Sequence, residues 1–181
     1  QQACYLVECV ANYKTSALIK SGLLPTVIEA AFRMACTDGK AKEEEDEDED
    51  EDDDYKIDPF HTGSHLLDAL ASFVPPKRVV APMLQLATAH VTSPSPHARR
   101  ASLTLLAILA EGCVEPMAKQ LDAILPCLLH CCSDTDQMVR RAAYVALGHV
   151  STHLQPEIFA HQHVILPLLL DALADRSVDI Q

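Results

Sequence analysis

The amino-acid sequence predicts an all-α solenoid, in which antiparallel pairs of helices stack side by side. Three observations predict this fold. Apolar residues recur at steps of three and four along most of the chain, as on one face of a helix. Proline recurs in matching apolar contexts at a nearly constant spacing. No segment alternates apolar and polar residues long enough to predict a strand.

The period is marked by Pro25, Pro82, Pro126 and Pro167. Their spacings are 57, 44 and 41 residues. Twelve acidic residues in a row lie inside the first interval, and removing these twelve from 57 leaves 45. A regular period of this length is typical of HEAT or armadillo repeats. The sequence therefore predicts a right-handed HEAT-repeat solenoid over 1–181, with the acidic residues as an insertion within one repeat.

Each period contains two predicted helices, the first of which has proline in its first or second turn. First helices are predicted over 22–37, 78–91, 119–132 and 158–174, second helices over 57–73, 97–113 and 136–153, and truncated second helices over 2–18 and from 177 onward. Between two of them, residues 133–136 supply turn and N-cap chemistry. The helix predicted over 136–153 carries four small residues, which should let a neighbouring helix approach closely: Ala142, Ala143, Ala146 and Gly148.

Both ends of the chain lie inside predicted helices, and neither carries the polar face of a capping repeat. We therefore expect the chain to be a central piece of a longer array, truncated at both ends. Its end faces are expected to carry apolar side chains that neighbouring repeats would cover, namely Leu6, Val10, Leu18, Leu169, Leu173 and Ile180.

The acidic run carries the whole charge imbalance of the chain. The formal net charge is −12, from 26 acidic residues and 14 Lys plus Arg, so the 14 acidic residues outside the run balance the bases. Like charges repel and nothing apolar interrupts them, so we expect a disordered loop over 40–56. A solvating linker is the simpler interpretation, and capture of basic partners is the functional one. The candidate partner-binding residues are Glu43, Glu44, Glu45, Asp46, Glu47, Asp48, Glu49, Asp50, Glu51, Asp52, Asp53 and Asp54.

Composition disfavours several other functions. The longest apolar stretches, such as 164–170, contain proline and are far shorter than the ~20 residues that span a membrane. A pI near 5.0 without a basic stripe disfavours nucleic acid as a partner. The five glycines form no phosphate-binding loop, and no Gly-x-Ser-x-Gly motif is present. We expect a protein that binds rather than an enzyme.

The seven cysteines show no framework spacing, which favours a reducing compartment over a secreted disulfide scaffold. Helical spacings would in principle allow a zinc site among Cys127, His130, Cys131, Cys132, His149 and His153. The repeat alignment, however, places these three cysteines opposite Leu168, Ala172 and Leu173 of the next repeat. Buried thiols commonly take such apolar positions. We therefore expect no metal site and no cofactor.

Several short segments together resemble one family. They are Val74-Pro75-Pro76-Lys77, Glu111-Gly112-Cys113, Asp134 with Val139-Arg140 and Ala142-Ala143, Ala146-Leu147-Gly148, and Leu154-Gln155-Pro156-Glu157. In this combination the chain is similar to importin-beta (karyopherin-beta) nuclear transport receptors, in particular the branch that contains importins four and five. The resemblance covers essentially the whole chain, and the family members are much longer.

The resemblance implies how such a chain would work. Second helices would line a concave surface that takes basic cargo and the GTP-bound form of Ran, and first helices would dock Phe-Gly nucleoporins. The protein would shuttle between cytoplasm and nucleus. Related arrays pair Asp and Arg of neighbouring repeats as a structural ladder, represented here by Asp134 and Arg140. Ser93 replaces the acid in the preceding repeat, and Asp179 replaces the base in the next.

Two alternatives stay open at this point. A HEAT scaffold or adaptor subunit would keep the solenoid without any GTPase. An acidic histone chaperone would bind basic proteins through the run without transport.

Overall fold

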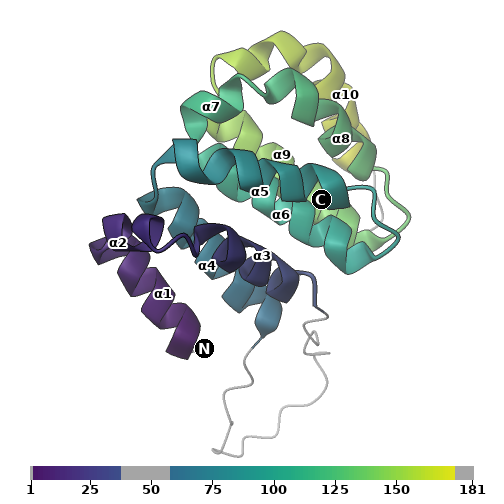
Figure 1. Ribbon diagram of the computed structural model, residues 1–181. Helices are drawn as coiled ribbons and strands as arrows, with labels where there is room; N and C mark the ends of the chain where they lie inside the picture. Colours follow the sequence, from purple (N-terminus) through teal and green to yellow (C-terminus); the bar gives the residue numbers. More distant parts are fainter. Residues whose placement is uncertain (1, 38–57, 174–181) are drawn as a thin grey trace, which may run out of the picture.

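The computed structural model describes residues 2–37 and 58–173, and in these residues it contains helices and no strand (Figure 1). The all-α prediction is confirmed. The helices are α1 (Gln2–Tyr13), α2 (Thr15–Lys20), α3 (Leu24–Ala35), α4 (Pro59–Phe73), α5 (Pro76–His90), α6 (Pro96–Gly112), α7 (Val114–Ala118), α8 (Leu121–Cys131), α9 (Gln137–His153), the 3-10 helix η1 (Glu157–His161) and α10 (Gln162–Leu173). The acidic run lies outside the described residues.

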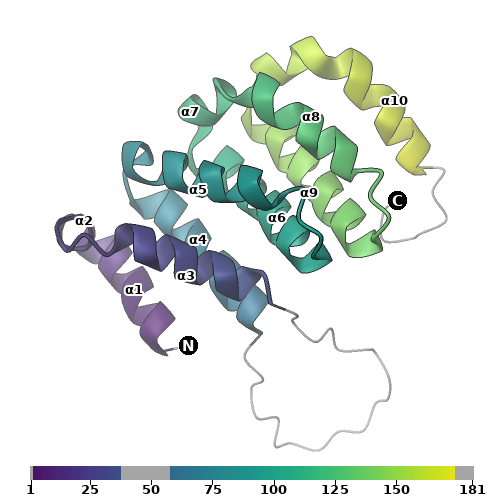
Figure 2. The same cartoon turned by 45° about the vertical axis from the view of Figure 1, so that its right-hand side comes forward.

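Three antiparallel pairs, α3 with α4, α5 with α6 and α8 with α9, stack as a solenoid. The first helices α3, α5 and α8 form one layer and the second helices α4, α6 and α9 the other (Figures 1 and 2). Neighbouring second helices pack on each other more extensively than neighbouring first helices do. An array with this difference curves toward its second helices, which therefore lie on the concave side.

Side-chain caps fix where the second helices begin. The carboxylates of Asp58 and Asp136 and the hydroxyl of Ser95 each accept a hydrogen bond from a backbone amide in the first turn of α4, α9 and α6, respectively. Pro59 and Pro96 occupy the first helical position of α4 and α6, where a missing N–H costs least. The turn and N-cap predicted at 133–136 is thus confirmed.

One apolar core runs through all the repeats. Leu128 of α8 and Leu147 of α9 lie on the apolar faces of their helices and are 0% and 1% exposed. The apolar stripes predicted from the sequence are therefore correct. At the N-terminal end Leu6 is exposed, as expected for an end face, whereas Leu18 is buried.

The helix boundaries differ from the predictions at three connections. The predicted helix 2–18 is two helices, because Lys14 leaves the helical region (φ −137°, ψ 36°). A short helix, α7, follows α6 directly and was not predicted. The start of the predicted helix 158–174 is the 3-10 helix η1.

Close helix approach depends on other glycines than the one predicted. Gly148 is exposed, and a Cβ added there would meet nothing within 4 Å, so the role assigned to it was wrong. A Cβ on Gly63 of α4 would overlap the carbonyl oxygen of Ala31 and lie 2.7 Å from the amide nitrogen of Ala35. Gly63 therefore sets how closely α4 packs on α3.

Candidate partner-binding surface

The concave surface is formed by the solvent-facing positions of the second helices. Exposed or half-buried residues recur there at three- and four-residue steps, namely His61, His65 and Asp68 on α4, Thr104, Ile108 and Glu111 on α6, and Arg141, Val145 and His149 on α9. Arginines lie near the start of α6 and α9, whereas histidines and carboxylates gather near their ends. The two ends of the concave surface therefore carry different ionisable groups.

An ion pair joins the repeats at the arginine end. Arg99 of α6 donates from Nε and Nη2 to the two carboxylate oxygens of Asp134, at 2.8 Å each. Its Nη1 also donates to the Ser93 carbonyl at 2.8 Å. Arg140 of α9 repeats this last contact one period later, since its Nη1 donates to the Asp134 carbonyl at 3.0 Å. Both residues expected in a ladder therefore lie at this junction, and the sequence reasoning missed Arg99, the partner of the Asp134 carboxylate.

Asp134 is held in its ionised form by this network. Burial raises the pKa of its carboxyl, but hydrogen bonds from Arg99 and from the Asp136 amide outweigh that effect, and the pKa lies below its ordinary value. The side chains of Arg99 and Asp134 are only 15% and 13% exposed, so water screens the pair weakly. The junction between these two repeats thus contains a charge-assisted, bidentate link.

Arg100 contacts described residues on both sides of the segment 38–57, which contains the acidic run. Its guanidinium carbon lies 3.7 Å from the centre of the Phe60 ring in the first turn of α4. Its Nη2 donates to the carbonyl of Thr37 at 3.3 Å, just before the segment 38–57. A third contact, from Nη1 to the sulfur of Met138 at 3.0 Å, reaches α9. Arg100 therefore links Thr37, the last described residue before the segment 38–57, to Phe60 in the first turn of α4.

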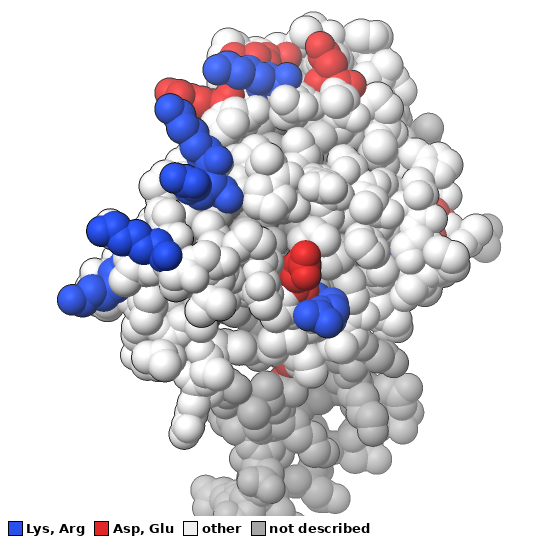
Figure 3. Space-filling view, in the orientation of Figure 1, with Lys and Arg blue, Asp and Glu red and all other residues white. Residues whose placement is uncertain are grey.

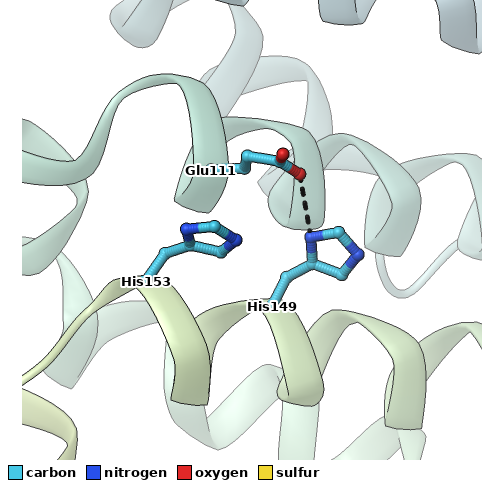
Figure 4. A group of neighbouring side chains, drawn as sticks. All are labelled: Glu111, His149 and His153. Atoms are coloured by element: carbon cyan, nitrogen blue, oxygen red, sulfur yellow. Dashed lines mark ion pairs between the residues drawn. The ribbon is translucent and has the colours of Figure 1, made fainter.

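At the other end, Glu111 of α6 meets two histidines of α9 (Figure 4). Its Oε2 lies 3.2 Å from Nδ1 of His149. The rings of His149 and His153 stack with centroids 5.9 Å apart. One ligand atom from each of the three residues lies within 4.8 Å of the other two. The sequence reasoning considered both histidines and missed Glu111.

Asp68 of α4 extends this group to a third repeat. Burial raises the pKa of its carboxyl, the negative charge of Glu111 raises it further, and His65 and His149 act in the opposite direction. The end of the concave surface thus concentrates carboxylates and imidazoles from α4, α6 and α9.

The cysteines do not belong to this group. Cys131 and Cys132 are buried, and burial raises the pKa of their thiols to about 11 and about 12. Neutral thiols are poor metal ligands. These two residues therefore act as small apolar side chains in the core, as the repeat alignment predicted.

The opposite layer, made by the first helices, has a different surface. Figure 3 views this layer and shows a mostly uncharged face, with Lys, Arg, Asp and Glu concentrated toward one edge and one further acidic and basic group nearer its middle. Among the described residues, no helix combines the length and apolar character that crossing a bilayer requires.

Comparison with known proteins agrees with this architecture. The HEAT-like repeat family matches residues 96–150, from α6 to α9. Human Importin-4 is 31% identical over 170 residues, which cover 89% of this chain and 16% of the human protein. The chain belongs to the importin-beta family. Probable importin subunit beta-4 of Schizosaccharomyces pombe is 30% identical over 114 residues, 63% of this chain and 11% of the yeast protein.

Solved structures of Kap121p share the fold. The crystal structure of Kap121p bound to Pho4p superimposes with a TM-score of 0.80 at 23% identity, and the match covers 99% of this chain and 18% of Kap121p. This importin-beta family chain therefore spans about one-sixth of the length of the curated relatives it matches.

Proposed function

We propose that the chain forms part of the partner-binding solenoid of a nuclear import receptor and acts by binding rather than by catalysis. The observation that carries this proposal is the 31% identity with human Importin-4 across 89% of the chain. The receptor shuttles between cytoplasm and nucleus, and its concave surface takes cargo.

The two helix layers and the related structures support the proposed partners. Kap121p has been solved bound to RanGTP and bound to Nup53p, and both structures match 94% of this chain with a TM-score of 0.76. By analogy, the second helices of this chain face cargo or the GTP form of Ran. The first helices dock Phe-Gly nucleoporins, and their largely uncharged face supports an apolar partner (Figure 3).

The acidic run Glu43–Asp54 captures basic cargo. The run places twelve consecutive carboxylates between Thr37 and Phe60 in the sequence, and Arg100 near the start of α6 contacts both of these residues. A concentrated negative charge accelerates the encounter with Lys- and Arg-rich segments, and salt screens the effect within about 10 Å at 0.1 M. Localisation signals, histones and ribosomal proteins all carry suitable charge.

Two variants, one that removes the charge of the acidic run and one that keeps it, test the capture role. In the first, Gly and Ser of equal length replace residues 43–54; in the matched control, each Asp becomes Glu and each Glu becomes Asp, which keeps the charge. Stopped-flow association with a Lys/Arg-rich localisation peptide is measured over a salt series. We expect the Gly/Ser variant to associate more slowly and to respond weakly to salt, and the control to match the wild type. Equal rates and equal salt slopes in all three proteins would leave the run as a solvating linker.

Ran separates transport from the alternatives. In the full-length receptor that contains this chain, we expect GTP-loaded Ran, and not GDP-loaded Ran, to release a bound basic cargo. A HEAT scaffold or an acidic histone chaperone would keep its partner in both cases. Retention of cargo with GTP-loaded Ran would therefore overturn the transport proposal without changing the fold.

A further inference from the structure

We propose that Glu111, His149 and His153 form a Zn²⁺ site on the concave surface, between the second helices of two neighbouring repeats. Imidazole nitrogen and carboxylate oxygen are ordinary zinc ligands, and two histidines with one glutamate make up the protein ligands of several open zinc sites. This site is independent of the cysteines and does not depend on the transport function.

The backbone already places the ligands for one ion. His149 and His153 are four residues apart on α9, so they lie one turn apart on the same face of the helix. Glu111 lies in the last turn of α6 and points toward them across the junction (Figure 4). The ligands of a tetrahedral zinc ion with bonds of about 2.1 Å are separated by about 3.4 Å. The 3.2 Å between Glu111 Oε2 and His149 Nδ1 matches this separation.

The environment favours a cation at this point. Nδ1 of His149 is shielded from solvent and makes no hydrogen bond to the described residues, although the Glu111 carboxylate is close. Asp68 of α4 adds a second carboxylate that interacts electrostatically with Glu111. A divalent ion between α6 and α9 would satisfy the shielded nitrogen and offset the repulsion between these carboxylates.

Access and an open coordination position follow from the exposure of the residues. Glu111 is exposed, and both histidines are partly buried, so an ion reaches them from the concave side without unfolding. Three protein ligands leave a fourth position for water or for a side chain of a bound partner. The ion would also bridge two repeats and stiffen the junction that the Arg99–Asp134 pair holds at its other end.

The site is tested by titrating Zn²⁺ into chelator-treated, reduced protein. We expect one ion per chain. Losing an outer-shell partner typically weakens metal binding about 10- to 100-fold, and losing a direct ligand should have a larger effect. We therefore expect E111Q, H149A and H153A each to weaken Zn²⁺ binding by at least that factor. H130A is the matched control, because His130 is an exposed histidine on α8 and lies outside the group. Circular dichroism checks that each variant keeps its helices.

Co²⁺ distinguishes this site from the thiols. Ligation by nitrogen and oxygen gives weak visible bands, whereas thiolate ligation adds intense near-ultraviolet charge-transfer absorption. A 1:1 complex without the thiolate band, lost in E111Q/H149A/H153A and kept in H130A, supports the proposal. Equal affinity in the wild type and the triple variant, a thiolate-dominated spectrum, or no stoichiometric binding would each overturn it.

Discussion

Replacing Asp134 by Asn tests the link between neighbouring repeats most directly. The Asn side chain keeps an oxygen for the Asp136 amide, which donates to Asp134 Oδ1 at 2.9 Å in the wild type. It removes the negative charge that faces two N–H groups of Arg99 at 2.8 Å. A hydrogen bond to a charged group contributes about 1.5–3 kcal/mol, and because Asn retains one acceptor oxygen, the substitution removes the equivalent of one such bond. We expect the substitution to lower the free energy of unfolding by about 1.5–3 kcal/mol.

The assay is urea unfolding followed by circular dichroism, with a matched carboxylate as the control. Asp122 also lies near another side chain, with its Oδ1 3.1 Å from Nε2 of His161, but the Asp122 side chain is 92% exposed. An exposed pair of this kind contributes about 0–1 kcal/mol, so D122N should lie near the wild type. A double-mutant cycle of D134N with R99M should give a coupling of at least about 0.5 kcal/mol. Equal losses in D134N and D122N, or a coupling near zero, would refute the inter-repeat role.

The same pair predicts a pH dependence with a definite sign. The pKa of Asp134 is lower in the folded chain than its ordinary value, so the folded state favours the ionised carboxyl. Its contribution is complete above the unfolded pKa of about 3.9 and is lost as the pH falls through the lower folded value. We expect the stability difference between wild type and D134N to be constant from pH 5 to 7 and to shrink below about pH 4. A difference that persisted at lower pH would contradict the ionic assignment.

Three further outcomes follow from the core. Leu128→Ala should cost about 2–5 kcal/mol in urea unfolding, since Leu128 is 0% exposed, whereas Leu170→Ala, at a residue 67% exposed, should cost less than about 0.5 kcal/mol. Gly63→Ala should destabilise by about 1–3 kcal/mol through overlap with α3, and Gly148→Ala, in open space, should be neutral or stabilising by up to about 1 kcal/mol. Cys131 and Cys132, with thiol pKa values of about 11 and about 12, should be alkylated at pH 8 at least about 10²-fold more slowly in the folded chain than in urea, as measured by mass spectrometry.

The paired helices could be predicted from the sequence because local signals there agree with the fold. Asp58 and Asp136 cap second helices whose apolar stripes match the buried faces, so cap and periodicity indicate the same boundary. The connections could not be predicted. The break at Lys14 lies between two segments that both favour helix, and only Cys113 separates the end of α6 at Gly112 from the start of α7 at Val114. Packing between repeats determines where such short helices begin and end, and local helix propensity does not contain this information.

Predicting the candidate site requires the register between repeats, that is, which residues of neighbouring second helices lie opposite each other. The repeat period alone does not give this register. Arg100 contacts Met138 38 residues later, and Glu111 contacts His149 at the same offset, whereas the thiol of Cys113 lies near the Ala71 carbonyl at an offset of 42. The proline spacings of 44 and 41 predict neither value. A shift of one residue turns a helix face by about 100°, so such an error moves every predicted partner off the surface.

The shared offset of 38 residues also explains which residues meet at the two ends of the α6–α9 junction. Once α6 and α9 are in register through Arg100 and Met138, the same offset of 38 places Glu111 beside His149, about three turns further along both helices. A substitution that changed this register would therefore disturb the arginine end and the histidine end together. E111Q and H149A, by contrast, lie far from Arg99 and should leave the D134N–R99M coupling unchanged. Measuring that coupling in the E111Q background separates a shift of the whole junction from a local change at the proposed metal site.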